Sequence, residues 1–199
     1  MLRVVLGVIG GVVLLIAVAL AYGYRRLTAG GDSVAVTMEA PPSRVFSAMS
    51  SYDSLGAWMS TAGNLAPMHH GPVHAGDTIA VGKNQRGDET RRILWLVDSL
   101  VPDRLMVTEI RSEPRGDIVA IRRDSLSARG GSTVVVSTIT SPLMDAVRGR
   151  ENNRTSEVRT ATTGVASKLM ISGFRMQAEL DLKRLRDHIE GRELPTDRR

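Results

Sequence analysis

The chain has 199 residues, of which 42% are hydrophobic and 24% are charged, a balance that argues against wholesale disorder and favours one globular domain with an appendage. The formal net charge is +5. However, only seven residues are aromatic and no dense basic run is interleaved with them, so the composition gives little support to nucleic-acid binding. Because the chain has no Cys, disulfides and thiolate chemistry are excluded.

The chain begins with a long uncharged segment. Residues 4–24 contain no charged side chain and would be about 31 Å long as a helix, enough for a hydrocarbon core of roughly 30 Å. Arg25 and Arg26 follow at once. The segment predicts a transmembrane anchor over residues 1–26, with a cleaved signal peptide as the alternative because residues 19–21 fit a small-x-small cleavage pattern. Basic residues on its two sides are nearly balanced, which leaves open the side of the membrane on which the domain lies.

A short linker at residues 27–32 is predicted to join this segment to the domain. Residues 33–38 alternate as a half-buried strand, with Val34, Val36 and Met38 on one face. Two prolines end the strand and Ser43 begins a short helix, and a second short helix is predicted over residues 52–59.

From Asp77 onward the hydrophobic period is two, which predicts consecutive strands. Their expected ranges are 77–81, 90–98, 104–111, 117–126 and 132–140. Turn residues separate them by short connections, and short connections favour an antiparallel meander over parallel pairing. Within the second of these strands, Ile93, Trp95 and Val97 are expected to face inward.

The last predicted element is a long helix over residues 162–190. Its apolar stripe consists of Ile171, Phe174, Ala178, Leu182, Leu185 and Ile189, widened by Val165, Leu169, Met176 and Leu180. Its solvent side is expected to carry Asp181, Lys183, Arg184, Arg186 and Asp187. The polar stretch 148–160 before it is predicted to be an exposed loop or a helix extension, and residues 192–199 a polar tail.

The order of these elements resembles the START-like (SRPBCC) superfamily, which includes polyketide cyclase/dehydrase-type and Bet v 1-type proteins. The similarity is carried by residues 39–59, 97–109, 130–140 and 173–191. The chain is also similar to small bacterial members with an N-terminal anchor helix. The polar stretch 148–160 departs from the family pattern, because it is longer than the usual connection into the last helix.

The resemblance implies an α+β helix-grip domain over residues 33–191, in which a curved antiparallel sheet wraps around the C-terminal helix. It implies a cavity between sheet and helix that binds a lipid or other apolar small molecule without a cofactor. With the N-terminal transmembrane helix, it implies a single-pass protein of a bacterial inner membrane. Two alternatives stay open: an enzyme of the cyclase or dehydratase kind acting on a polyketide-like or aromatic substrate, and a co-chaperone-like interaction module.

Large apolar side chains with an occasional polar tip suit a cavity that orients an apolar ligand. The expected ligand-binding residues are Tyr52, Trp58, Trp95, Met170 and Phe174, for which plain core packing is the alternative. No residue is identified as catalytic and no metal site is expected. His69, His70 and His74 are better explained as a surface loop than as zinc ligands, because neighbouring histidines seldom converge on one ion.

Four charged residues fall within the predicted strands: Glu109, Arg111, Arg122 and Asp124. One of them could point into the cavity and act as an acid, a base or an oxyanion partner. Because strands alternate, the default expectation is that these side chains lie on the solvated face of the sheet.

Overall fold

The computed structural model describes residues 32–62, 69–83, 92–113, 115–142 and 157–192. The predicted anchor at residues 1–26 lies outside this part of the chain, as do residues 27–31 of the linker and residues 193–199 of the polar tail. Within the described ranges, no helix is both long and apolar enough to cross a membrane.

The domain is α+β, as predicted. Its elements are β1 (Ser33–Met38), α2 (Pro42–Met49), α3 (Tyr52–Trp58), β2 (Thr78–Lys83), β3 (Arg92–Val101), β4 (Leu105–Ser112), β5 (Asp117–Arg129), β6 (Ser132–Thr140) and α5 (Glu157–Ile189). β5 runs further than predicted because Gly130 and Gly131, both with positive φ, form the tight turn into β6 directly after Arg129. α5 begins at Glu157, so the helix-extension reading of the polar stretch holds for residues 157–160.

The strands form one antiparallel six-stranded sheet in the order β1-β6-β5-β4-β3-β2. β2 to β6 follow one another as the predicted meander, whereas β1 pairs with β6, the last strand in the sequence. In that pairing Val36 lies opposite Val135. Apolar side chains from the first and the last strand of the sequence therefore share one face of the sheet.

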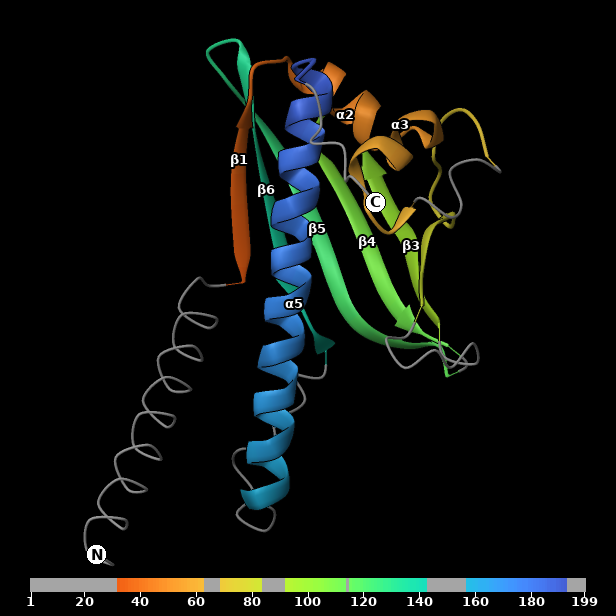
Figure 1. The fold of residues 1–199 in the computed structure, drawn as a ribbon, viewed down its shortest axis with the longest axis vertical. Coiled ribbons are helices and arrows are strands. Elements are labelled where there is room, and N and C mark those ends of the chain that lie inside the picture. Colours follow the sequence, from red (N-terminus) through yellow and green to blue (C-terminus); the bar gives the residue numbers. More distant parts are fainter. Residues whose placement is uncertain (1–31, 63–68, 84–91, 114, 143–156, 193–199) are drawn as a thin grey trace, which may run out of the picture. The chain divides into compact units, whose positions relative to one another are not determined.

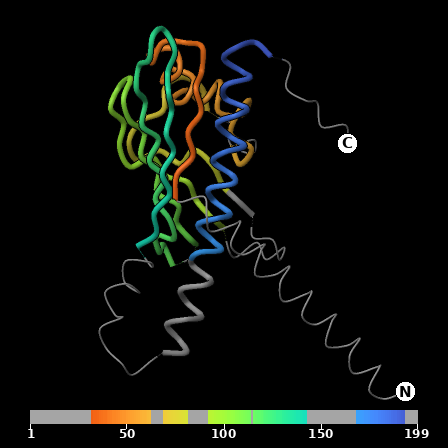
Figure 2. Tube along the Cα trace, turned by 90° about the vertical axis from the view of Figure 1, so that its left-hand side faces the viewer, coloured from red at the N-terminus to blue at the C-terminus, as the bar shows by residue number. Residues whose placement is uncertain are grey.

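The C-terminal helix α5 lies over the inner face of the sheet, closest to β1 and β6 (Figures 1 and 2). α2 and α3 pack beside it. Most of the predicted stripe is buried against these elements: Ile171, Ala178, Leu182, Leu185 and Ile189. From the sheet, Trp95 and Val97 face this core, as the alternation in β3 predicts, and Ile93 packs against it.

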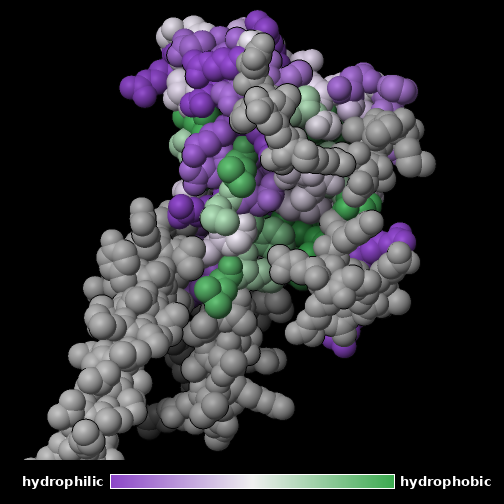
Figure 3. Space-filling view, in the orientation of Figure 1, coloured by the Kyte–Doolittle hydropathy of each residue, from purple (hydrophilic) through white to green (hydrophobic). Residues whose placement is uncertain are grey.

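The stripe on α5 is narrower than predicted. Leu169, Met176 and Leu180 are 46%, 59% and 48% exposed. The prediction that they widen the buried face is therefore wrong, and Val165 has no described side chain. The physical reason is that α5 meets the sheet along one side only, so residues turned away from β1 and β6 face water. Figure 3 shows hydrophobic residues among hydrophilic ones on the side of the molecule where α5 lies.

Asp181 corrects a second expectation about α5. Its side chain is fully buried, whereas the sequence pattern assigned it to the solvent side. Asp181 follows Ala178 by three positions and precedes Leu185 by four, so the helix brings it onto the same face as these two buried residues.

Candidate functional site beneath the C-terminal helix

Polar side chains interrupt the apolar inner face of the sheet beneath α5. Arg122 and Asp124 on β5, Thr108 on β4 and Ser137 on β6 are each no more than 2% exposed. Arg122 lies opposite Thr108, and Asp124 lies opposite Ser137. Side chains in register on neighbouring strands lie on one face, so the four residues form one polar area inside the core. The expectation that Arg122 and Asp124 face solvent is wrong.

Arg122 forms two ion pairs. Its Nε donates to Asp124 at 3.0 Å, and its Nη1 donates to Oδ2 of Asp181 at 3.0 Å. Asp124 is two residues away on the same strand face, whereas Asp181 comes from α5. The pair with Asp181 therefore ties the helix to the middle of the sheet. We call Arg122, Asp124, Asp181 and Ser137 the inner cluster.

Of the two carboxylates of the inner cluster, Asp181 accepts more of the described hydrogen bonds. Its Oδ1 accepts from Gln177 Nε2 at 2.9 Å, one helical turn earlier on α5. The same oxygen accepts from the backbone N–H and the hydroxyl of Ser60, at 3.3 and 3.4 Å. Ser60 lies two residues after the end of α3, so Asp181 joins three parts of the fold.

Trp58 borders Arg122 on another side. The guanidinium carbon lies 6.0 Å from the centroid of the indole ring, within the range of a cation–π contact. The ring is held in place because its Nε1 donates to the carbonyl oxygen of Ala48 at 3.1 Å. One of the expected ligand-binding residues thus contacts the inner cluster.

The charges of the inner cluster do not cancel. Burial by itself lowers the pKa of Arg122, but the charges of Asp124 and Asp181 and their hydrogen bonds outweigh it and raise this pKa above its ordinary value. Arg122 is therefore a cation. Against this single positive charge stand two carboxylates, so the formal charge of the cluster is −1, inside an apolar core where unpaired charge is costly.

Two atoms of the inner cluster have no hydrogen-bond partner among the described residues. They are Nη2 of Arg122 and the hydroxyl oxygen of Ser137, both buried. Buried polar groups are satisfied in the great majority of cases, so each such group requires an explanation. A ligand head group or ordered water would supply the missing bonds.

Glu109 and Arg111 lie on the opposite face of the sheet. Arg111 Nε donates to Glu109 at 2.8 Å, and both side chains are partly exposed. These two charges meet the default expectation for a solvated sheet face. Because they are an arginine and a carboxylate on the outer face, Arg111 and Glu109 are suitable control positions for substitutions of Arg122 and Asp124.

The other expected ligand-binding residues lie in two places. Trp95 and Phe174 meet edge to face, with ring centroids 6.0 Å apart, between β3 and α5. Met170 is half-buried on α5, one turn before Phe174. Tyr52 lies apart from them: its ring is 5.1 Å from that of His69. Burial, and then the charge of and hydrogen bond to Asp77, raise the pKa of its hydroxyl to about 12.

The histidines expected on a surface loop, His69, His70 and His74, are exposed. His70 pairs with Asp53 at 2.9 Å, and His74 lies 3.7 Å from Asp77. The His70 hydrogen bond and one from the backbone of Gly71 lower the pKa of Asp53.

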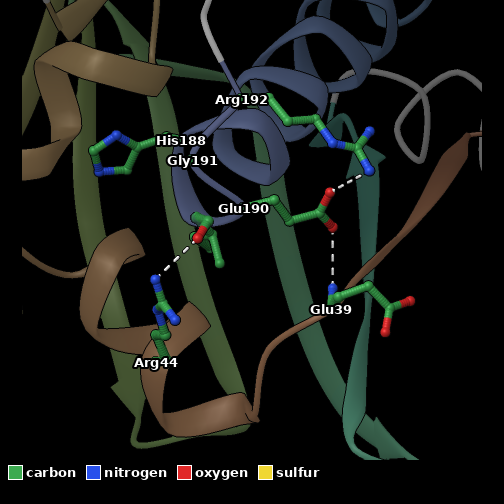
Figure 4. A pocket seen from close by; sticks show the side chains of 7 residues that line it. Glu39, Arg44, His188, Glu190, Gly191 and Arg192 are labelled. Carbon is green, nitrogen blue, oxygen red and sulfur yellow. Dashed lines mark hydrogen bonds and ion pairs between the residues drawn. The ribbon is translucent and has the colours of Figure 1, made fainter.

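Two open surface pockets are lined by other residues than the inner cluster. One, of about 500 Å³, lies at the C-terminal end of α5 (Figure 4). There Arg44 donates to the carbonyl oxygen of Ile189 at 3.0 Å, and Glu190 accepts from the backbone of Glu39 at 3.1 Å and pairs with Arg192. The charged side chains of Arg44, Glu190 and Arg192 are thus engaged in contacts at the end of α5. The second, of about 550 Å³, lies near the start of α2 and the β3–β4 turn.

The sequence pattern did not identify four of the residues of this site, namely Asp181, Gln177, Ser60 and Ser137. For Asp181 a signal existed, because its spacing to Ala178 and Leu185 is that of the apolar stripe. Gln177 is one helical turn before Asp181, so it could have followed from the same argument. For Ser60, at the end of a short helix, the sequence carries no comparable signal.

Comparison with known proteins adds information about the fold. No family model matches the chain, and a search of curated proteins gave no match. A solved structure from Arthrobacter aurescens is similar with a TM-score of 0.50 at 13% identity, over 84% of this chain and 91% of that one. The Aha1 dimer from Colwellia psychrerythraea is similar with a TM-score of 0.50 at 14% identity, over 79% and 94%.

A third similar structure is DynU16, from the dynemicin biosynthetic locus, with a TM-score of 0.48 at 13% identity. The match spans 79% of this chain but 46% of DynU16, so the chain corresponds to about half of that protein's length. At such identities likeness concerns the fold alone. The Arthrobacter aurescens and Colwellia psychrerythraea structures therefore show a fold similar to that of this domain.

Proposed function

We propose that this domain binds a mainly apolar small molecule, such as a lipid, between the inner face of the sheet and α5, with the polar head of the ligand at the inner cluster. The proposal includes tethering through residues 4–24, which would keep the binding site close to a bilayer in which apolar ligands partition.

The observation that carries the proposal is that the inner cluster is buried, charged and incompletely hydrogen-bonded. Replacing a buried ion-pair triad by well-packed apolar residues is often neutral or stabilising. Stability alone therefore gives no reason to retain Arg122 and two carboxylates in the core. A few convergent polar groups in an otherwise apolar site are typical of small-molecule binding, where they fix the orientation of the ligand.

Apolar side chains near the inner cluster would bind the rest of the ligand. Trp58 contacts Arg122, and Trp95 and Phe174 meet under α5. Each Å² of apolar ligand surface moved from water to such surroundings contributes about 25 cal/mol. The proposed mechanism is therefore sequestration, driven by apolar burial and oriented by hydrogen bonds.

The experiment is native mass spectrometry of the full chain in detergent, followed by extraction and identification of released small molecules. Wild-type protein should carry a bound molecule as purified, or acquire one from a panel of lipids, quinones and polyketides. Arg122→Lys should lose it, because Lys keeps the positive charge but lacks the planar fork and its Nη2 donor.

The matched control is Arg111→Lys on the outer face, which should retain the ligand like wild type. Wild-type protein that stays empty across the panel would contradict the proposed function. Equal retention by a folded Arg122→Lys variant would contradict the role given to the inner cluster.

A second candidate function is a cyclase or dehydratase reaction on a polyketide-like or aromatic substrate. It is favoured by one observation: Asp124 and Arg122 point into the core rather than into solvent. In such a reaction Asp124 would serve as the base, and Arg122 would stabilise the developing negative charge. If wild type converts a polyketide-like substrate and Asp124→Asn does not, the enzymatic function is favoured. If wild type leaves the substrate unchanged, ligand binding without a reaction is favoured.

A further inference from the structure

We propose that the inner cluster selects ligands with a neutral hydroxyl head group and rejects otherwise identical carboxylates. This inference rests on the proposed function and adds the chemical class of the ligand. It follows from the charges and free hydrogen-bonding atoms of Arg122, Asp124, Asp181 and Ser137.

The inner cluster has free hydrogen-bond donors and acceptors. Nη2 of Arg122 is a buried donor without a partner among the described residues, and the hydroxyl of Ser137 can both donate and accept. Asp124 pairs with Arg122 Nε, and an ionised carboxylate has about four acceptor positions. The inner cluster therefore contains both free donors and free acceptors, the combination that a hydroxyl group can use.

The two carboxylates of the inner cluster have different hydrogen-bond partners. Asp181 receives hydrogen bonds from Arg122, Gln177 and Ser60. Among the described residues, the only side chain that pairs with Asp124 is that of Arg122, and Ser137 lies opposite Asp124 on β6. Asp124 is thus the carboxylate that can accept from a ligand, while Asp181 holds the guanidinium in position.

The charge of the inner cluster disfavours an anionic head group. Any group that accepts from Nη2 lies close to both carboxylates, because the guanidinium is compact and planar and its other two nitrogens are paired with them. The formal charge of the cluster is already −1, so a carboxylate head would add a second uncompensated negative charge in a medium of low dielectric constant. A hydroxyl head adds no charge and satisfies Nη2.

The test is a competition between matched probes with the same apolar body. The full chain in detergent is equilibrated at pH 8 with equal amounts of tetradecan-1-ol and tetradecanoate, and separately with 2-naphthalenemethanol and 2-naphthoate. Native mass spectrometry then gives the ratio of bound alcohol to bound acid. Three proteins are compared: wild type, Asp124→Asn, and Glu109→Gln, a matched control on the outer face.

Wild type and Glu109→Gln should bind the alcohols in preference to the acids. Asp124→Asn removes the excess negative charge, so its ratio should shift toward the acid by about 10-fold or more, a conservative figure for one like charge in a buried site. Because partitioning into detergent is common to all three proteins, it cancels in the comparison.

The outcomes separate the two proposals. If wild type binds neither the alcohol nor the acid of either pair, the proposed function fails for ligands with these two apolar parts. If wild type binds the acids as well as the alcohols, or if Asp124→Asn leaves the ratio unchanged, the selectivity inference is overturned while binding stands. Should Asp124→Asn fail to fold, Ser137→Ala replaces it: its charges are those of wild type, so it should bind the alcohols several-fold more weakly and keep the preference. A loss of preference in Ser137→Ala would count against the charge argument.

Discussion

At the scale of single residues, Arg122 is the group that pairs the buried charges of its two carboxylate neighbours. It gives one planar group to two carboxylates, at 3.0 Å each, and the ring of Trp58 lies beside it. Removing one of the three charged side chains leaves a buried charge without its partner. Replacing Arg122, Asp124 and Asp181 together leaves no buried charge to be paired. The two kinds of change should therefore have opposite consequences for stability.

Asp181→Ala should destabilise the domain by about 3–5 kcal/mol, because Arg122, Gln177 and Ser60 all lose their acceptor. Replacing Arg122, Asp124 and Asp181 together by Leu or Met should cost far less. Urea unfolding followed by circular dichroism measures both. Asp187→Ala is the control, since that carboxylate is partly exposed on the same helix and should change stability by less than about 1 kcal/mol. A similar loss for the triple variant and for Asp181→Ala would show that the cluster is needed for folding.

Tyr52 predicts a second effect at this scale, on the pH dependence of stability. Its hydroxyl has an ordinary pKa of 10.0, raised in the folded protein to about 12 by burial and by Asp77. Unfolded chains lose this proton first, so the stabilising contribution is fully present below pH 10 and is lost as the pH rises through 12. Unfolding free energies measured between these pH values should fall less steeply in Tyr52→Phe than in wild type. Asp77→Asn should bring the pKa back toward its ordinary value, and an unchanged slope in both variants would refute the assignment.

At the scale of secondary structure, α5 illustrates what a sequence pattern can and cannot specify. The spacing of Ile171, Ala178, Leu182 and Leu185 identified the buried face correctly. The pattern could not give the width of that face, because the width depends on how much of the helix the sheet covers. Leu180 and Asp181 show this: hydrophobicity alone assigns them to the wrong sides.

The neighbouring leucines of α5 provide a direct comparison. Leu182 is fully buried and Leu180 is 48% exposed, so the same substitution should have very different effects. Leu182→Ala should lower the free energy of unfolding by about 2–5 kcal/mol, the range for a buried Leu that leaves a cavity. Leu180→Ala should change it by no more than about 0.5 kcal/mol. Thermal and urea unfolding of the two variants test this, and equal losses would mean that the exposed side of α5 is covered in the protein.

Strand β5 shows the same limit for a sheet. Ala120, Arg122, Asp124 and Leu126 share the inner face, while Ile121 lies on the other. Both sets mix apolar and polar residues, so alternation alone does not decide which faces the core. The pairing of the strands decides which set faces the core, because Asp124 lies opposite buried Met106 and Ser137. Such a contact between strands cannot be read from a single sequence.

At the scale of the whole molecule, the fold could be predicted from the order of its elements, whereas the site could not. Short turns between strands and one long amphipathic helix are sufficient for an antiparallel sheet covered by α5. The expected aromatic residues Trp58, Trp95 and Phe174 were found near α5 or the inner cluster because they are large and apolar. Charged members of the candidate site were assigned to solvent by the rule that charges are exposed, a rule that Arg122, Asp124 and Asp181 do not follow.

The proposed role of the inner cluster is to hold the head of an apolar ligand. An experimental structure of the full chain, purified in detergent without added ligand or soaked with tetradecan-1-ol, tests this role directly. We expect non-protein density within hydrogen-bond distance of Arg122 Nη2 and Ser137 Oγ, continuing into the apolar interior beneath α5. A tightly packed interior, with one water molecule bridging those two atoms and no further density, would contradict it.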